Sequence, residues 1–373
     1  MKKEEMLQKW KKEILFTTLQ HTIADLEKYL QCHIQQILKN VYCDIDAILK
    51  NIVENQNEQK VAYITFHLMR KDIIDGIYQY RVFLYDNSWY IKRGQQLGTL
   101  NSSFIYQYYD AFCKQVFQKS NEYRHYFSIP EIEMFIMQNL EVFHYYFVEI
   151  LRYVMNDISE SDNYYKIKKE QTLEIQSGEY YEPCDKIYQE QTEKDYGKWK
   201  RELLKQQNVI WSFEDLQGID CNGMTAIEAD FRYTNFKRSD LQYINMQNSI
   251  LMGARFQYCN MMYADLKQTV LNYACFDYAN LEGACFDYAI TMLDNILYGM
   301  VKVKPAFYII SFQKCNLKYA SLKGVVFKYA DFRGADLTNA DFTDAVLEQC
   351  LFSAQHMNQT HFSEQQKKQI KIV

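Results

Sequence analysis

The chain has 373 residues, 48 % of them hydrophobic, and a formal net charge of -5. That length is enough for two domains, each with its own core. The mildly acidic charge gives no electrostatic reason to bind nucleic acid or an anionic membrane, and no stretch of about eighteen apolar residues could span a bilayer. Residues 1–14 carry charges in place of an apolar signal core, so we expect a cytoplasmic protein.

Residues 1–157 predict an N-terminal, mainly helical α+β domain. Apolar residues at helical spacing predict a long amphipathic helix over about residues 3–30, which continues or restarts through residue 38, and a further helical piece over 44–53. Alternating apolar and polar residues predict a strand over 62–69.

The next segments predict a hairpin and two more helices. Residues 78–85 and 89–91 read as two strands around a polar turn, which would give a small antiparallel sheet flanked by helices. One helix is expected over 103–118. Another begins at Ser128, because Ser-x-x-Glu with an early proline is a helix start signal, and its apolar face continues to residue 154.

Residues 158–197 are polar and charged, and they predict a linker between this domain and a second one over 198–373. Within the second part, the chain repeats every five residues. A large apolar residue recurs at each step, and a small residue stands two positions before nearly every such centre. The centres are Phe231, Phe236, Leu241, Met246, Leu251, Phe256, Met261, Leu266, Leu271, Phe276, Leu281 and Phe286, followed one residue out of phase by Phe312, Leu317, Leu322, Phe327, Phe332, Leu337, Phe342, Leu347 and Phe352.

A period of five fits neither a helix, which needs 3.6, nor a strand, which needs 2. It indicates a chain that turns a corner at each repeat and stacks into a solenoid with one continuous core. Residues 330–344 read ADFRG, ADLTN and ADFTD, and they resemble the A-[DN]-[LF]-x-x unit of the pentapeptide repeat family. The resemblance covers about residues 213–355. It implies a right-handed quadrilateral β-helix, four repeats to a coil, with the centre and the small residue pointing inward.

Both ends of such a solenoid need cover, because they expose core and unpaired strand edges. A short helix over 198–207 is expected to cap the first coil. At the other end, Met357, Phe362 and Ile370 would fold over the last coil. The alternative is that this tail forms a homodimer contact, as C-terminal segments do in some proteins of the family.

Tyrosines that follow a centre by two residues are the first candidates for partner binding. In a four-sided coil, residues twenty apart stack at roughly 4.8 Å, which places Tyr243 over Tyr263 and Tyr258 over Tyr278. Stacked rings would stabilise the coil by roughly 0.2 to 1 kcal/mol per pair. They would equally suit a protein or peptide partner, because tyrosine is favoured at interfaces.

Some pentapeptide repeat proteins resemble B-form DNA and protect type II topoisomerases such as gyrase. That mimicry requires carboxylates spread over the faces, whereas residues 213–355 hold sixteen acidic and twelve basic side chains, a net of about -4. Lys318, Lys323, Lys328 and Arg333 form a basic belt that would repel a DNA-binding saddle. The belt would pair with Asp331, Asp336, Asp341 and Glu348 of the neighbouring coil, or, through Lys318 and Lys323, contact a partner.

The centres Phe286 and Phe312 are 26 residues apart, one more than five repeats, which predicts a bulge or an excursion. Residues 298–305 form an apolar and basic patch there, with Met300, Lys302 and Lys304 as further candidate contacts, or they are an insertion without consequence.

No motif for catalysis, a cofactor or a metal is visible. The sequence lacks a Gly-rich phosphate loop, GxSxG and HExxH, and its ten cysteines form no CxxC pair. We therefore expect a non-catalytic interaction or scaffold protein that presents a rigid β-helical surface, with topoisomerase protection as the alternative. A third possibility is an enzyme or accessory function in residues 1–157, in which a cleft would gather His67 or His144 with carboxylates.

Overall fold

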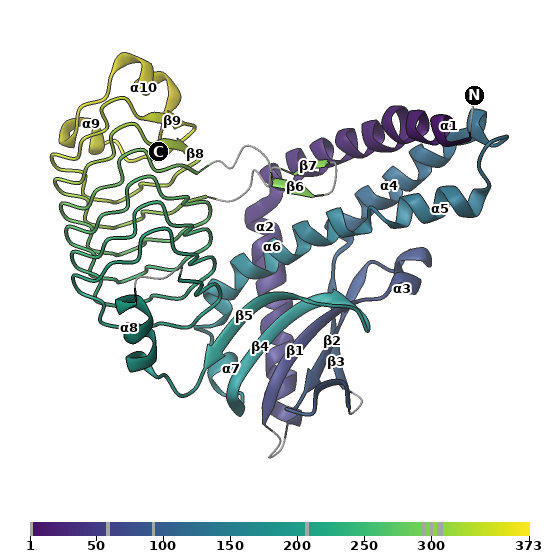
Figure 1. Ribbon diagram of the computed structural model, residues 1–373, viewed down its shortest axis with the longest axis horizontal. Helices are drawn as coiled ribbons and strands as arrows, with labels where there is room; N and C mark the ends of the chain where they lie inside the picture. Colours follow the sequence, from purple (N-terminus) through teal and green to yellow (C-terminus); the bar gives the residue numbers. More distant parts are fainter. Residues whose placement is uncertain are drawn as a thin grey trace. The chain divides into compact units, whose positions relative to one another are not determined.

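The computed structural model describes residues 3–56, 60–91, 94–205, 209–291, 296–298, 301–303 and 309–373. The chain divides into two compact units, shown as a ribbon in Figure 1. The first comprises Met1–Tyr188 with Asp294–Phe307, and the second Gln189–Leu293 with Tyr308–Val373. Across the described ranges, no helix combines the length and the apolar character that a membrane crossing requires.

The first unit is built from helices around one sheet. Its elements in chain order are α1 (Lys3–Trp10), the π-helical turn η1 (Lys11–Phe16), α2 (Thr17–Asn55), β1 (Val61–Leu68), α3 (Arg70–Ile74), β2 (Gln79–Tyr85), the 3-10 helix η2 (Trp89–Ile91), β3 (Gln95–Asn101), α4 (Ser103–Lys119), the 3-10 helix η3 (Ser120–Tyr123), α5 (Ile129–Met137), α6 (Leu140–Ile158), α7 (Asp162–Tyr165), β4 (Lys169–Glu179), β5 (Asp185–Gln191), β6 (Ile296–Tyr298) and β7 (Val301–Val303).

The helices follow the predicted pattern with two differences. The separate pieces expected before residue 55 form one helical run, in which α1, η1 and α2 follow each other without a break. The helix start at Ser128 is confirmed, since its hydroxyl accepts from the Glu131 N–H while the Glu131 carboxylate accepts from the Ser128 N–H. The apolar stretch after it is two helices, because α5 ends at Met137, where the Asn139 side chain donates to the Phe135 carbonyl, 2.7 Å away.

The sheet is mixed and larger than predicted, with the strand order β3-β2-β1-β4-β5. β1 pairs antiparallel with β2, and β2 with β3, but β1 pairs parallel with β4. The structure thus differs from a purely antiparallel sheet, because the helices α4 to α6 carry the chain back to the start of the sheet before β4 begins. The structure also places α7, β4 and β5 within residues 158–197, where the sequence predicts a linker.

The predicted hairpin has a different second strand. β2 pairs with β3, whereas Trp89–Ile91 form η2 in the connection between them. The reason is tertiary packing, since the Trp89 ring stands edge-on to Tyr63 at 3.7 Å between centroids and stacks on Tyr85 at 6.1 Å.

The second unit is a β-helix solenoid. After α8 (Tyr196–Leu204), parallel bridges join residues twenty apart at every fifth position, beginning with Ile210 to Asp230 and Asp215 to Asn235. The N–H of a centre and the N–H two residues later both donate to the next coil, as Phe256 does to Cys275 at 2.7 Å and Tyr258 to Asp277 at 3.1 Å. The remaining elements are β8 (Val326–Lys328), β9 (Val346–Glu348), β10 (Leu351–Phe352), α9 (His356–Gln359), α10 (Glu364–Gln369) and β11 (Lys371–Ile372).

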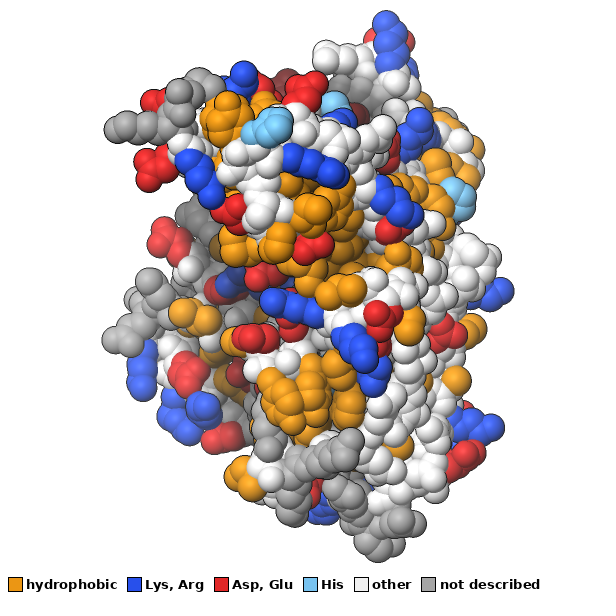
Figure 2. All heavy atoms as spheres, turned by 90° about the vertical axis from the view of Figure 1, so that its right-hand side faces the viewer, with side chains coloured by type: hydrophobic (Ala, Val, Ile, Leu, Met, Phe, Trp, Pro, Cys, Tyr) orange, Lys and Arg blue, Asp and Glu red, His pale blue; other side chains and the backbone are white. Residues whose placement is uncertain are grey.

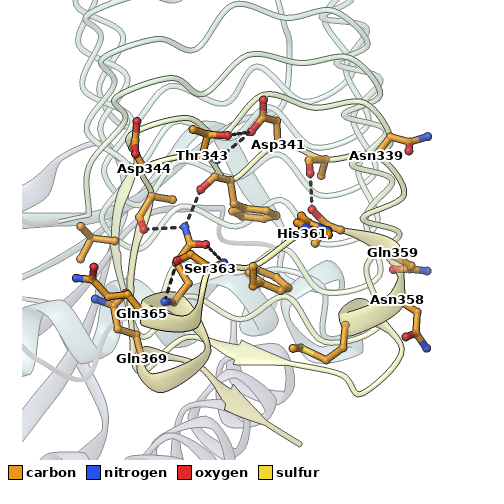
Figure 3. Close-up of a pocket in the computed structure, with 18 residues that line it drawn as sticks. Asn339, Asp341, Thr343, Asp344, Asn358, Gln359, His361, Ser363, Gln365 and Gln369 are labelled. Carbon is orange, nitrogen blue, oxygen red and sulfur yellow. Dashed lines mark hydrogen bonds between the residues drawn. The ribbon is translucent and has the colours of Figure 1, made fainter.

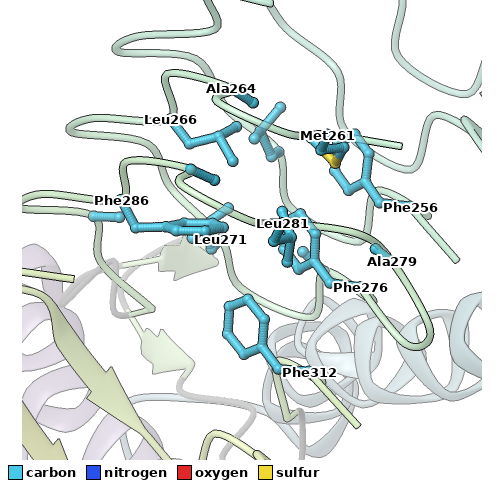
Figure 4. Packing of buried hydrophobic residues seen from close by; sticks show 14 of the residues in the cluster. Phe256, Met261, Ala264, Leu266, Leu271, Phe276, Ala279, Leu281, Phe286 and Phe312 are labelled. Carbon is cyan, nitrogen blue, oxygen red and sulfur yellow. The ribbon is translucent and has the colours of Figure 1, made fainter. Parts of the chain in front are cut away.

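All the predicted centres are buried in one continuous core. Phenylalanine rings of successive coils stack within it, with centroids 4.8 Å apart for Phe256 and Phe276 and 5.0 Å for Phe276 and Phe312 (Figure 4). Offset-stacked rings at such spacing add roughly 0.5 to 1.5 kcal/mol per pair beyond the area they bury.

The irregular spacing between the centres Phe286 and Phe312 reflects an excursion of sixteen residues. Across it, the bridge spacing grows from 20 to 36, as between Cys275 and Ser311, and the bridges then continue at 20. The antiparallel pair β6 and β7 lies in this excursion and belongs to the first unit. Met300 and Lys304 fall outside the described residues, and Lys302 lies in β7, where side chains are not described.

Side chains from both flanking segments enter the repeat core. Trp199 and Leu203 of α8 are buried in it at one end. At the other end, Phe362 packs on Phe342 and Phe352, with centroids 5.5 and 5.1 Å away, and Met357 and Ile370 pack against the same core.

Candidate binding surface on the repeat unit

The candidate tyrosines occupy the corner of each repeat in an unusual backbone conformation. Tyr243, Tyr258, Tyr263 and Tyr278 have φ values of 55°, 60°, 56° and 61°. This left-handed region costs a residue with a Cβ roughly 1 to 2 kcal/mol. The corner turns each ring outward, so the four side chains remain 45 to 57 % exposed.

The four rings form two stacked columns, as the twenty-residue spacing predicts. Tyr243 and Tyr263 lie 5.3 Å apart with 15° between their planes, and Tyr258 and Tyr278 lie 4.9 Å apart with 9° between theirs. Both stacks are parallel enough to act as flat aromatic surfaces.

Two cations extend the second column. The Arg238 guanidinium lies 5.8 Å from the Tyr258 ring centroid, and the Lys314 ammonium lies 5.2 Å from that of Tyr278. Lys314 also donates to the Tyr278 hydroxyl at 3.1 Å. The sequence did not single out these cations. Arg238 stands twenty residues before Tyr258, but Lys314 reaches the column only because the excursion is sixteen residues long.

An asparagine ladder runs along the coil edges between the two columns. The Asn280 side-chain amide donates to Asn260 Oδ1 at 3.3 Å, and the Asn316 side-chain amide donates to Asn280 Oδ1 at 2.9 Å. In residues 258–263, the coil passes from one tyrosine corner through Asn260 to the next tyrosine corner, whereas Arg238 and Gly283 hold the corners opposite Tyr243 and Tyr278. We call these seven residues the tyrosine face: Tyr243, Tyr258, Tyr263, Tyr278, Asn260, Asn280 and Asn316. It combines exposed aromatic rings with side-chain carboxamides, groups that match the donors and acceptors of a peptide backbone. Carboxylates border the asparagines, since Asp240 bridges to Asn260 and the Asn316 amide also donates to Glu282 at 3.2 Å.

The basic belt is paired, as one interpretation predicted. Three pairs join a lysine to the following coil: Lys318 to Asp336 and Lys323 to Asp341, both at 3.2 Å, and Lys328 to Glu348 at 2.9 Å. The fourth stays within its own coil, where Arg333 contacts Asp331 at 2.6 Å.

Contacts in the belt also lower the pKa of a carboxylate. The Thr343 hydroxyl and, to a smaller extent, Lys323 lower the pKa of Asp341. Within the belt, each of these carboxylates is therefore balanced by a nearby cation. On the face shown in Figure 2, which is seen from the right-hand side of Figure 1, acidic and basic side chains are interspersed as well.

In the first unit, His144 belongs to a buried hydrogen-bonded chain. The Tyr80 hydroxyl contacts the Tyr106 hydroxyl at 2.6 Å and His144 Nδ1 at 2.7 Å, and His144 Nε2 lies 3.6 Å from an Asp185 carboxylate oxygen. His67 is fully buried, and burial lowers its pKa to about 4.

Two cavities of about 430 and 460 Å³ in this unit are lined by neither His67 nor His144. Over the described ranges, no group of three His, Cys, Asp or Glu side chains is arranged to hold a metal ion.

The comparisons with known proteins concern the repeats. The model of the family described as pentapeptide repeats matches residues 249–287 and 310–344, with eight copies. A search of curated proteins finds no match.

Among solved structures, the chain is similar to QnrB1, a plasmid-mediated fluoroquinolone resistance protein, with 14 % identity, a TM-score of 0.29, and coverage of 44 % of this chain and 90 % of that chain. It is also similar to Rfr23 from the cyanobacterium Cyanothece, with 15 % identity, a TM-score of 0.22, and coverage of 40 % and 94 %. HetL from the cyanobacterium Nostoc, which is involved in heterocyst differentiation regulation, shows 23 % identity, a TM-score of 0.14, and coverage of 39 % and 73 %.

The matched residues coincide with the five-residue spacing and with the bridged coils described above. No family model matches the first unit. Residues 249–287 and 310–344 of the repeat part are therefore pentapeptide repeats.

Proposed function

We propose that this chain is a non-catalytic interaction or scaffold protein whose tyrosine face binds a protein or a peptide. The observation that carries the proposal is the pair of exposed tyrosine columns around the asparagine ladder. The rings are held by backbone that is hydrogen-bonded to both neighbouring coils. A surface fixed in this way loses little conformational entropy on binding.

The architecture behind this surface is a right-handed quadrilateral β-helix. Four bridge positions in each twenty-residue coil support the four-sided form, and the resemblance to the family implies the hand. We place the protein in the cytoplasm, which its ten free cysteines support, because reducing compartments keep thiols unpaired. The burial of Phe362 supports a capping role for the C-terminal tail over a homodimer contact.

The other candidate contacts are secondary in this proposal. Lys318 and Lys323 already pair with carboxylates, so a partner would have to compete for them. Met300, Lys302 and Lys304 stay candidate contacts for the same partner on sequence grounds alone.

The test compares two sets of tyrosines in the full chain. Tyr258→Ser with Tyr278→Ser removes one column, and Tyr288→Ser is the matched control, because Tyr288 has a φ of 61° and is 64 % exposed but lies outside the tyrosine face. Each variant serves as bait for quantitative affinity capture from the source cells. We expect captured partners to bind the double variant at least about 30-fold more weakly, the loss typical of an aromatic hot spot near 2 kcal/mol. Equal retention by the double variant and the control would refute the role of this face.

Protection of a type II topoisomerase by DNA mimicry is the alternative function. It needs carboxylates free to stand in for phosphates, and the pairing of Asp331, Asp336 and Asp341 with cations counts against it. A gyrase supercoiling assay with a fluoroquinolone, with and without the protein, separates the two functions, since QnrB1 is a fluoroquinolone resistance protein. We expect no protection. An accessory function in the first unit would instead depend on the chain of Tyr80, His144 and Asp185.

A further inference from the structure

The last coil of the repeat unit ends in backbone donors that need acceptors from elsewhere. In an inner coil, the donor pair of each repeat bonds to two carbonyls of the next coil, as Leu322 N–H does to Asp341 at 2.8 Å and Gly324 N–H to Thr343 at 2.9 Å. The final coil has no following coil. Its donors would be left without partners unless the C-terminal segment replaced those carbonyls.

The C-terminal segment does this for three of the four donor pairs. The Phe332 N–H donates to the Leu351 carbonyl, and the Gly334 N–H donates to the Ser353 hydroxyl at 3.2 Å. Two glutamines serve one pair each, using the side-chain oxygen for the first donor and the main-chain oxygen for the second. These bonds are Leu337 N–H to Gln359 Oε1 at 3.2 Å, Asn339 N–H to Gln359 O at 3.1 Å, Leu347 N–H to Gln369 Oε1 at 3.0 Å, and Gln349 N–H to Gln369 O at 2.8 Å.

The fourth pair, Phe342 N–H and Asp344 N–H, has no acceptor in the part of the chain that the structure describes. Both residues line a cavity of about 1070 Å³ between the last coil and the segment of α9 and α10. Figure 3 shows Asp341, Thr343 and Asp344 on one side of it and Ser363, Gln365 and Gln369 on the other. Elsewhere in the solenoid, two N–H groups with this spacing receive carbonyls from residues two apart on a neighbouring coil.

We propose that this cavity is a second binding site, which takes an extended peptide segment. Carbonyls of two peptide residues, two positions apart, accept from Phe342 N–H and Asp344 N–H, so the peptide adds as a short strand to the end of the β-helix. The charge of the lining points to a basic peptide. Asp341 is paired with Lys323, but Asp344 forms no ion pair among the described side chains and is exposed. A lysine or arginine of the peptide therefore meets an unpaired carboxylate. This site is separate from the tyrosine face and does not depend on it.

The test is amide hydrogen exchange of the full chain, resolved by NMR. Without ligand, the Phe342 and Asp344 amides exchange at least about tenfold faster than those of Leu337 and Leu347, because a missing hydrogen bond lowers the local opening free energy by about 1.4 kcal/mol. The probe is the blocked pentapeptide Thr-Val-Lys-Val-Thr, and its control carries Glu in place of Lys. We expect the probe to slow both amides several-fold and the control to have a weaker effect.

Matched variants test the location. Gln365→Trp places a large side chain in the cavity lining, whereas Lys368→Trp changes an exposed residue of the same helix that does not line it. The peptide should protect the two amides in Lys368→Trp but not in Gln365→Trp. The proposal fails if the probe gives no protection, or gives equal protection in both variants. It also fails if the amides become protected with rising protein concentration alone, which would assign the site to a second copy of the chain.

Discussion

Gly283→Ala tests how the tyrosine columns are held. Gly283 has a φ of 67°, and a Cβ added there would lie 2.5 Å from two carbons of the Tyr263 ring. Gly223 is the control, because its φ is 66° and a Cβ there would meet nothing within 4 Å. The two substitutions therefore share the backbone cost and differ in the ring.

The magnitudes follow from these two contributions. Alanine in the left-handed region costs roughly 1 to 2 kcal/mol at either position. At Gly283 the Tyr263 ring must also move off its stack with Tyr243, which forfeits roughly 0.5 to 1.5 kcal/mol more. We expect Gly283→Ala to destabilise the repeat unit by about 1.5 to 3.5 kcal/mol and Gly223→Ala by about 1 to 2 kcal/mol.

Native-state hydrogen exchange of repeat amides measures both losses without assuming that the two units unfold together. A double-mutant cycle with Tyr263→Ala isolates the ring. In that background, Gly283→Ala should cost no more than Gly223→Ala does. Equal losses for the two glycines in the native background would show that the ring moves aside freely, and that the columns are not rigid.

Three further predictions concern other parts of the molecule. Gln359→Ala leaves the buried Leu337 N–H without its acceptor, so that amide should exchange roughly 5- to 30-fold faster, the equivalent of about 1 to 2 kcal/mol, while Asn358→Ala should leave it unchanged. His67 binds a proton in the unfolded state near pH 6.5 but in the folded state only near pH 4, so its contribution to stability is complete above pH 6.5 and is lost as the pH falls toward 4. Urea unfolding should show this loss, at most about 3 kcal/mol, and His67→Phe should remove it; an unchanged pH slope would contradict the burial of a neutral ring. Lys323→Ala breaks an ion pair whose side chains are 50 and 41 % exposed, so thermal unfolding should register less than about 0.5 kcal/mol, and a larger loss would mean that the belt holds the coils together.

The repeat core could be predicted from the sequence because the place of a residue in the five-residue pattern already indicates whether its side chain is buried. Phe256, Phe276 and Phe312 recur at the same place in their repeats, so a pattern of five residues already states which side chains face inward. The tyrosine stacks followed from the same spacing once the twenty-residue coil was assumed. The length of the excursion did not, because the spacing of 26 residues between Phe286 and Phe312 does not say that Phe312 stacks on Phe276.

The sheet of the first unit depends on pairing between distant segments. β1 and β4 are separated by about a hundred residues, and β4 alternates Leu173 and Ile175 with Glu174 in a stretch that reads as charged. β4 is part of the sheet because it pairs with β1, and no pattern within residues 169–179 indicates that pairing. The same holds for Gln359 and Gln369. In the sequence they look like any polar residue of a tail. Their role as acceptors becomes evident only when the unpaired N–H groups of the last coil are known.

The way the bridges resume after the excursion shows what holds the solenoid in register. Cys275 and Ser311 pair as if the sixteen residues between the coils were absent. The register of each coil is set by its bridges to the neighbouring coil, and at that point it depends little on the covalent chain. The corner after Thr291 is therefore a natural place to sever the polypeptide. Residues 309–373, supplied as a separate fragment, would find on the remaining coils a template that already specifies where each of their strands belongs.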